Sequence, residues 1–260
     1  MAILTIDNLS ISFGGLKAVD DLSFSVPEKS IYGLIGPNGA GKTTVFNCIS
    51  RFYTPDQGQV MLQGRQGEVD LLGVNVHEVI EHGMVRTFQN VELIDHMSLK
   101  DNLLVGMHHG MNIGLVENLL GLGKKKEQAF EQKALEVLDF LGLAHLAGEP
   151  AGGQPYGILK LVELGRTLMS DPKIIILDEP AAGMNHTETE ELTSLIRKIR
   201  DQLGITVLLV EHDMALVMNL CERICAISFG KKIAEGTPEE IQNHPGVQEA
   251  YLGTEEEVTC

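Results

Sequence analysis

A glycine-rich segment at residues 36–44 constrains this 260-residue chain more than any other stretch. It follows the apolar run 31–35 and matches the pattern G-x-x-x-x-G-K-S/T. The segment reads Gly36, Pro37, Asn38, Gly39, Ala40, Gly41, Lys42, Thr43 and Thr44. Glycines let successive backbone N–H groups curl around an anion, and the first turn of the helix that follows favours negative charge. The sequence therefore predicts a polyphosphate-binding loop between a buried strand and a helix.

The last residues of this loop supply the groups that a nucleotide requires. Lys42 is expected to reach the β- and γ-phosphates, and the hydroxyl of Thr43 is expected to hold Mg²⁺. Mg²⁺ prefers hard oxygen ligands and keeps several waters, so it needs few ligands from the protein. We therefore expect a nucleotide bound together with Mg²⁺ at this loop.

Composition limits the classes of partner. The chain is 43% hydrophobic, which supports a substantial core in one large domain or two small ones. Its 36 acidic residues against 20 lysines and arginines give a formal net charge of −16. Because nucleic acids and anionic membranes attract basic surfaces, this excess argues against broad electrostatic binding to either. A phosphate ligand must therefore be held locally.

The chain carries no sequence signal for a membrane span or for export. No apolar run approaches the roughly 20 residues that a spanning helix needs, and the first residues lack the pattern of a signal peptide. We expect a soluble, cytoplasmic protein. The four cysteines form no C-x-x-C pair, so we expect neither a disulfide framework nor a zinc site. They are Cys48, Cys221, Cys225 and Cys260.

The first half of the chain changes from strand patterns to helical ones. Alternating apolar residues within 3–26 predict half-buried antiparallel strands, and residues 64–76 have the mixed polarity of a variable loop. A strand pattern then ends in a polar corner at Gln89. Residues 91–170 show helical spacing and predict an α-helical insertion. Phe13, in a turn between the first strands, is either a core residue or an aromatic platform for a nucleobase.

Two buried strands in the second half end in groups that carry chemistry. The apolar run 174–177 ends at Asp178 and Glu179, and ligands bind at the carboxyl ends of strands in open α/β sheets. Asp178 can then hold Mg²⁺, and Glu179 can polarise an attacking water. The run 205–210 ends before His212, for which a structural role and a functional role both stay open.

The C-terminal part has clear helix boundaries. An amphipathic helix is expected over residues 187–203, closed by Gly204, followed by a hairpin over 224–234. Thr237 and Glu240 form the pattern of a capping box at the start of a later helix.

Together these segments resemble the ATP-binding subunit of an ABC transporter, over nearly the whole chain. The resemblance implies an α/β P-loop NTPase: a RecA-like core with an N-terminal antiparallel β subdomain and an inserted α-helical subdomain. It implies a single domain over residues 1–260, with the helical subdomain at about 91–170 and a C-terminal tail at about 244–260. The bound molecules would be ATP and Mg²⁺.

The resemblance also implies roles for individual residues. Gln89 would sense Mg²⁺ and the attacking water, and Asp178 would order the metal. Glu179 would be the general base, and His212 would contact the γ-phosphate. Lys42 would complete the catalytic set on the phosphate side.

Further roles concern the nucleobase and the partner cassette. Phe13 would stack on adenine, residues 39–44 would cradle the phosphates, and residues 181–185 would cross a dimer interface. In this family the signature segment of one subunit closes over the nucleotide of the other, so Gly157 would meet the partner's γ-phosphate through backbone N–H groups.

The signature segment departs from the family pattern. Where the family usually has Leu-Ser-Gly-Gly-Gln, this chain has Gln154, Pro155, Tyr156, Gly157 and Ile158. The serine hydroxyl and the glutamine amide are therefore absent. We hypothesise weaker or asymmetric hydrolysis that depends on a partner subunit.

Four segments make the chain resemble importers of branched-chain amino acids in particular: residues 85–89, the signature variant Tyr156 and Gly157, residues 178–185 and residues 211–214. The long insert 106–126 also resembles that branch. Importers of urea and short amides share these features, and the ATPases of lipopolysaccharide export have a similar segment order. We expect a subunit peripheral to the inner face of the membrane, working with a second ATPase subunit, a permease and indirectly a solute-binding protein. The permease would dock near residues 91–102.

Two rival interpretations come from other classes. Soluble ABC ATPases of ribosomes or DNA repair usually carry two cassettes or a long coiled coil, and this sequence has one cassette and no sustained heptads. A P-loop kinase would transfer phosphate to a small molecule. The Asp178 and Glu179 pair with a later strand-end histidine favours water as the nucleophile.

Overall fold

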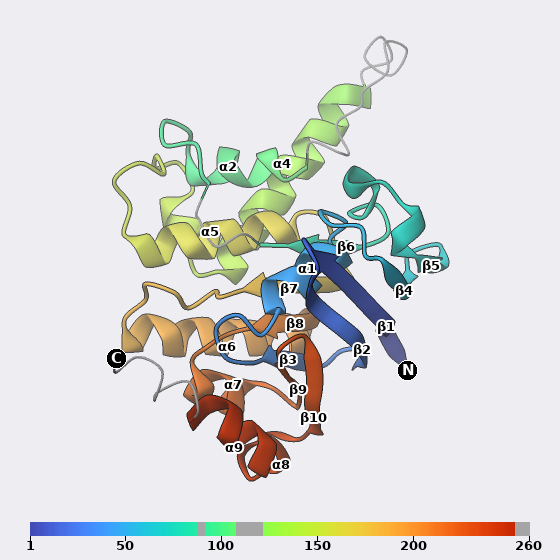
Figure 1. Cartoon of the computed structure of the whole chain (residues 1–260). Helices are drawn as coiled ribbons and strands as arrows, with labels where there is room; N and C mark the ends of the chain where they lie inside the picture. The colour runs from blue at the N-terminus through green and yellow to red at the C-terminus, as the bar shows by residue number, and fades with distance from the viewer. Residues whose placement is uncertain (88–91, 108–121, 253–260) are drawn as a thin grey trace.

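The computed structural model describes residues 1–87, 92–107 and 122–252, which form two β-sheets and the helices that pack against them (Figure 1). Gln89 and residues 108–121 of the long insert lie outside the described residues. The α/β architecture expected from the sequence is confirmed. The subdomain limits near residues 91 and 170 stay predictions.

The larger sheet has six strands in the order β10-β9-β3-β8-β7-β6. Its strands from β9 to β6 are parallel, and β10 pairs antiparallel with β9 at the edge. The strands are β3 (Ile31–Ile35), β6 (Met84–Arg86), β7 (Ile174–Asp178), β8 (Thr206–Val210), β9 (Arg223–Ser228) and β10 (Lys231–Gly236). Every residue of β3, β7 and β8 is buried, as expected for apolar runs in a parallel sheet covered on both faces.

The smaller sheet is antiparallel, with the order β2-β1-β4-β5. Its strands are β1 (Ala2–Phe13), β2 (Leu16–Pro27), β4 (Gln57–Gly64) and β5 (Gly67–Asp70). The prediction of a loop over residues 64–76 is wrong, because β5 and the short 3₁₀-helix Leu71–Gly73 lie there. β5 is a four-residue edge strand whose side chains are exposed or half-buried, so it leaves no apolar alternation in the sequence.

Helix α1 (Lys42–Ile49) packs between the two sheets. Alternate residues of β3 separate two cores: Tyr32 and Leu34 face α1 and the antiparallel sheet, whereas Ile31 and Ile35 face the helices on the other side. The helix ends at Ile49, because the chain turns through a left-handed backbone at Arg51 (φ 67°). The phosphate-binding segment therefore connects a buried strand to a buried helix.

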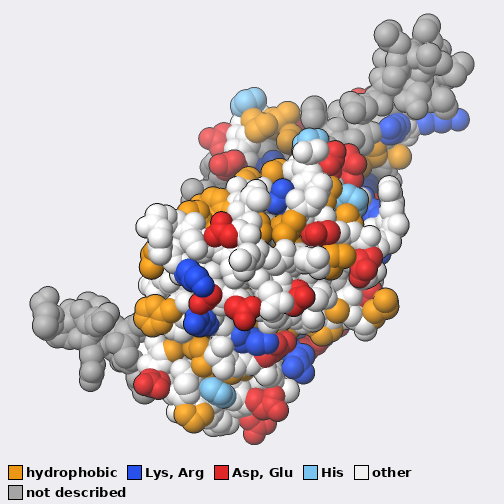
Figure 2. Space-filling model, turned by 45° about the vertical axis from the view of Figure 1, so that its right-hand side comes forward, with side chains coloured by type: hydrophobic (Ala, Val, Ile, Leu, Met, Phe, Trp, Pro, Cys, Tyr) orange, Lys and Arg blue, Asp and Glu red, His pale blue; other side chains and the backbone are white. Residues whose placement is uncertain are grey.

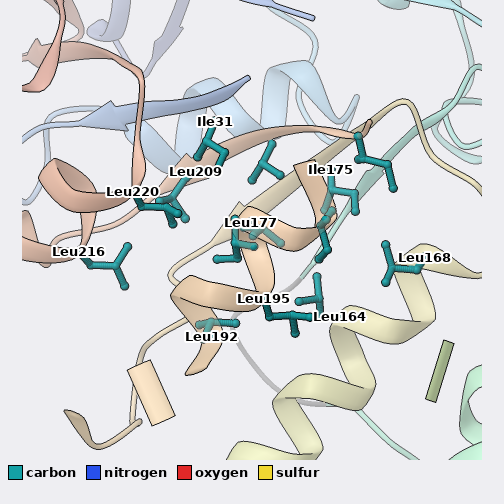
Figure 3. Close-up of a cluster of buried hydrophobic side chains, with 14 of the residues drawn as sticks. Ile31, Leu164, Leu168, Ile175, Leu177, Leu192, Leu195, Leu209, Leu216 and Leu220 are labelled. Carbon is teal, nitrogen blue, oxygen red and sulfur yellow. The ribbon is translucent and has the colours of Figure 1, made fainter. Parts of the chain in front are cut away.

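Three helices gather at one end of the molecule, at the top of Figure 1. They are α2 (Leu99–Val105), α4 (Leu122–Phe140) and α5 (Tyr156–Leu168). Figure 3 shows Leu164 and Leu168 of α5 facing Ile175 of β7 and Leu195 of helix α6 (His186–Leu203). This shared core fixes α5 against the strand that carries Asp178.

The helices of the C-terminal half pack on the same face of the larger sheet as α5. They are α6 (His186–Leu203), α7 (Met214–Leu220), α8 (Pro238–Gln242) and α9 (Pro245–Leu252). Gly204 ends α6 in a left-handed conformation (φ 66°), and Thr237 and Glu240 form the capping box of α8, which confirms both predictions. The expected hairpin is β9 and β10.

The surface shows no segregation of charge on the face drawn in Figure 2, where acidic, basic and hydrophobic side chains are interspersed. Among residues 1–87, 92–107 and 122–252, none of the helices combines the length and the apolar character needed to cross a membrane. Over the same ranges, no cluster of three or more histidine, cysteine or acidic side chains forms a metal site. Cys48, Cys221 and Cys225 are buried free thiols.

Candidate functional site

The phosphate-binding loop is built by close backbone approach. A Cβ on Gly36 would overlap the carbonyl oxygen of Ile227, and a Cβ on Gly41 would lie 2.5 Å from the carbonyl oxygen of Ala18. Gly41 also has a φ of 102°, which strains any other residue. The loop is fixed from outside by the turn after β9, where Gly230 N–H donates to the carbonyl of Ala40 (2.9 Å). These contacts fit a pre-formed anion-binding loop.

Lys42 begins α1 and turns back over the loop. Its Nζ donates to the carbonyl oxygens of Gly36 (2.6 Å) and Pro37 (3.1 Å), and the residue is buried. Burial lowers the pKa of Lys42, while the nearby carboxylates Glu179 and Asp178 act to raise it. The loop thus holds a cationic group close to two acids, as the binding of a metal–phosphate complex requires.

Asp178, the last residue of β7, is paired with an arginine that the sequence analysis did not single out. Arg86, at the end of β6, donates from Nη2 to Oδ2 of Asp178 over 2.6 Å. The Arg86 and Asp178 side chains are 9% and 4% exposed. Arg86 also donates to Oδ1 of Asn47 in α1 (2.8 Å) and lies 5.6 Å from the ring centre of Phe46. One guanidinium therefore joins three elements around Asp178.

Glu179 and His212 lie side by side at the carboxyl ends of β7 and β8. Oε1 of Glu179 is 3.9 Å from Nδ1 of His212. Glu179 has a left-handed backbone (φ 48°), and its N–H donates to the carbonyl of Val210 (2.9 Å). Such a conformation is uncommon for a glutamate and re-aims its side chain at the end of the strand. The Glu179 side chain stays 29% exposed, so water can reach it.

Glu211 is the second group that the sequence analysis missed. The residue is 1% exposed, and it accepts hydrogen bonds from the N–H groups of Ala181 (2.9 Å) and His212 (3.2 Å). Its position directly after β8 repeats that of Glu179 directly after β7. This repetition of an acidic residue after a buried strand was the signal in the sequence that could have identified Glu211.

The remaining predicted residues lie at the ends of other elements. Phe13, at the end of β1, is 47% exposed and packs edge-on against Tyr53, with ring centres 5.3 Å apart. Thr43 is exposed in the first turn of α1. Gly157 lies in the first turn of α5, where a Cβ would lie 2.9 Å from Oε1 of Glu188 at the start of α6. The structure thus brings Lys42, Asp178, Glu179 and His212 together, and it leaves Gly157 beside α6.

Comparisons with known proteins agree over nearly the whole chain. The ABC transporter family profile matches residues 19–182, and the profile described as branched-chain amino acid ATP-binding cassette transporter matches residues 231–257. The high-affinity branched-chain amino acid transport ATP-binding protein BraF of Pseudomonas aeruginosa is 42% identical over 253 residues, which cover 96% of this chain and 98% of BraF. The corresponding protein LivG of Salmonella typhimurium is 43% identical over 258 residues, covering 96% and 98%.

Solved structures give the same result. An ATP-binding cassette of an ABC transporter in its ADP conformation superposes with a TM-score of 0.84 at 33% identity, covering 97% of this chain and 99% of the other. The chain belongs to the ABC transporter family and is one of its ATP-binding cassettes. The relatives that it matches along its length are described as ATP-binding proteins of branched-chain amino acid transport.

Proposed function

We propose that this chain is the ATP-hydrolysing subunit of an importer of branched-chain amino acids. One observation carries the proposal. Asp178, Glu179 and His212 lie together at the carboxyl edge of the sheet, next to Lys42 of the phosphate-binding loop. The substrate class follows from the full-length similarity to BraF and LivG. The subunit would act in the cytoplasm, at the inner face of the membrane.

In this proposal each residue has one role in binding or hydrolysing ATP. The N–H groups of residues 39–44 and Nζ of Lys42 bind the phosphates of ATP, and Phe13 offers its exposed ring to adenine. Glu179 accepts a proton from the attacking water as general base. His212 contacts the γ-phosphate. Gln89 senses the attacking water.

Magnesium fits the same edge. Asp178 accepts from Arg86 through Oδ2, so its other oxygen, Oδ1, is the one proposed to hold Mg²⁺ through water, together with the hydroxyl of Thr43 and with Gln89. When bound, Mg²⁺ would neutralise charge that develops on the phosphate oxygens. Arg86 orients the carboxylate of Asp178 through the hydrogen bond to Oδ2.

Uptake assays test the substrate class. Cells lacking this gene should fail to import labelled leucine, isoleucine and valine at low external concentration, and the intact gene should restore import. Urea and acetamide are tested as alternative substrates, because importers of urea and short amides share the sequence features of this chain. Restored uptake of urea without uptake of leucine would overturn the assignment, and no restored uptake at all would favour a soluble ATPase.

A second cassette would complete the site. The backbone N–H groups around Gly157, at the start of α5, would meet the γ-phosphate held by the partner. Pro155 precedes α5 and provides no side-chain hydrogen bond to its first turn. The partner's nucleotide would therefore be met by fewer donors than a serine-containing signature offers.

Restoring the two missing polar groups should raise ATP hydrolysis. We expect Pro155→Ser with Ile158→Gln to increase phosphate release by the assembled complex roughly tenfold, because one hydrogen bond to a charged group contributes about 1.5–3 kcal/mol. Pro155→Ala with Ile158→Leu is the matched control and should leave the rate unchanged. An equal rate in both double variants would contradict the role of these groups.

The loop before α2 would receive the permease. Asn102 is 1% exposed and fixes this loop: its Oδ1 accepts from Ile94 N–H (2.8 Å), and its Nδ2 donates to the carbonyls of Ile94, Met97 and Ser98. Ile94, 38% exposed, is thereby presented on a fixed backbone. A rigid loop with an exposed apolar side chain suits a helix that must transmit motion.

A charge at this position should uncouple transport from hydrolysis. We expect Ile94→Asp to lower amino-acid uptake roughly tenfold or more, because losing an apolar anchor at an interface costs about 1–2 kcal/mol or more. Phosphate release by the isolated subunit should not change. Ile94→Met keeps the apolar contact and should transport normally. Normal uptake by the aspartate variant would place the docking surface elsewhere.

A further inference from the structure

The buried carboxylate of Glu211 joins two loops at the carboxyl edge of the sheet, and the steps proposed above give it no role. Oε1 accepts the N–H of Ala181 (2.9 Å), and Oε2 accepts the N–H of His212 (3.2 Å). Burial of a carboxylate is unfavourable unless its oxygens are hydrogen-bonded. Both loops are therefore fixed to one side chain whose own surroundings exclude water.

The net pKa shift of the Glu211 carboxyl is upward, because burial outweighs the groups that favour its ionised form. Burial raises the pKa of its carboxyl, and the N–H groups of Ala181, His212 and Asp213, with the His212 ring, act in the opposite direction. The Nδ1 atom of His212 lies 3.7 Å from Oε2. The two loops thus supply the groups that favour the ionised carboxylate.

Each of the two loops continues to another part of the site. Ala181 begins residues 181–185, and in this loop a Cβ on Gly183 would lie 3.2 Å from the ring of Tyr156 in the signature segment. On the other side, Nδ1 of His212 lies 3.9 Å from Oε1 of Glu179. Glu211 therefore lies between the loop beside Tyr156 and the histidine beside Glu179, within one chain.

We infer that Glu211 is a positioning residue that couples the loop 181–185 to His212. When a partner cassette engages that loop, Glu211 transmits its position to the histidine and so to the geometry around Glu179. The inference rests on the proposed ATPase function. Glu211 acts through His212, and a physical link of this kind is tested by measured coupling between residues.

Glu211→Gln is the sharpest variant, because it keeps the shape of the side chain. A carboxylate can accept from both loops, whereas an amide has one acceptor oxygen, so one of the two N–H groups would face an NH₂ group instead. We expect kcat for phosphate release by the full chain to fall about tenfold, with KM for ATP within about twofold. Hydrogen exchange should become faster in peptides covering residues 180–185 or 209–213.

A double variant distinguishes a role of Glu211 in positioning His212 from a general loss of structure at the site. If Glu211 acts through His212, then Glu211→Gln should cause no further loss of kcat in a His212→Ala background. Glu235→Gln is the matched control, since Glu235 accepts from the hydroxyl of Tyr32 (2.8 Å) away from the site, and it should leave kcat unchanged.

Three results would overturn the inference: an unchanged kcat in Glu211→Gln, the same fold loss with and without His212, or unchanged hydrogen exchange in both loops. Failure of the proposed function would look different, because the unaltered protein would then release no phosphate. In that case the hydrogen-exchange comparison still tests whether Glu211 couples the loops. Thermal unfolding of each variant shows whether a loss of activity reflects a loss of folded protein.

Discussion

Glu179→Gln should lower ATP hydrolysis by about 10²–10⁴-fold, the usual effect of removing a general base. The amide keeps the shape of the side chain and cannot accept a proton from water. The strand end, its left-handed backbone and the hydrogen bond to the carbonyl of Val210 do not depend on the carboxylate. ATP binding should therefore persist, and binding of a labelled ATP should be measured beside phosphate release.

Glu190→Gln provides the matched control for this variant. Glu190 lies on α6 with a side chain that is 71% exposed, and its partner in the structure is His186 on the same helix. Hydrolysis by the control should equal that of the unaltered protein. A Glu179→Gln protein that still hydrolyses ATP at a normal rate would remove Glu179 from the mechanism and require another base.

Removing the positive charge from Arg86 should have the largest effect on stability. In Arg86→Met the buried carboxylate of Asp178 would lose the guanidinium that lies 2.6 Å from it. Breaking a buried ion pair by removing one partner costs about 3–5 kcal/mol, because the other charge stays buried. Urea unfolding should show a fall of that size in the free energy of unfolding.

A double-mutant cycle assigns this loss to the pair. Adding Asp178→Asn to Arg86→Met removes the unpaired charge, so the double variant should regain much of the stability. Lys17→Met is the control, since Lys17 pairs with Asp20 at the surface with a side chain that is 62% exposed, and its loss should matter little. A single Arg86→Met variant as stable as the unaltered protein would contradict the role given to this pair.

The sequence was most informative where local pattern and chemistry coincide. The apolar runs before Gly36, Asp178 and Glu211 are fully buried parallel strands, and parallel strands bring their carboxyl ends to one edge. This geometry is why residues far apart in the chain could be predicted to meet. The end of α6 could be predicted from Gly204, and the start of α8 from the capping box at Thr237.

Tertiary partners could not be predicted, because no local pattern encodes them. Arg86 and Asp178 are 92 residues apart, and neither the spacing nor the composition around Arg86 distinguishes it from a surface arginine. Glu211 is similar, since its partners are backbone N–H groups rather than a recognisable side chain. Strand β5 was missed because its edge position needs little apolar surface. The packing of Phe13 against Tyr53 likewise depends on how β1 meets the end of α1.

The position of β3 between β8 and β9 also bears on the synthesis of the protein. β3 precedes the phosphate-binding loop, and its neighbours in the sheet lie at Thr206–Val210 and Arg223–Ser228. A ribosome must therefore release most of the chain before this strand gains either neighbour. Pairing between such distant segments slows folding and exposes unpaired strand edges in the meantime. Nascent chains that end before β8 should accordingly need protection from aggregation.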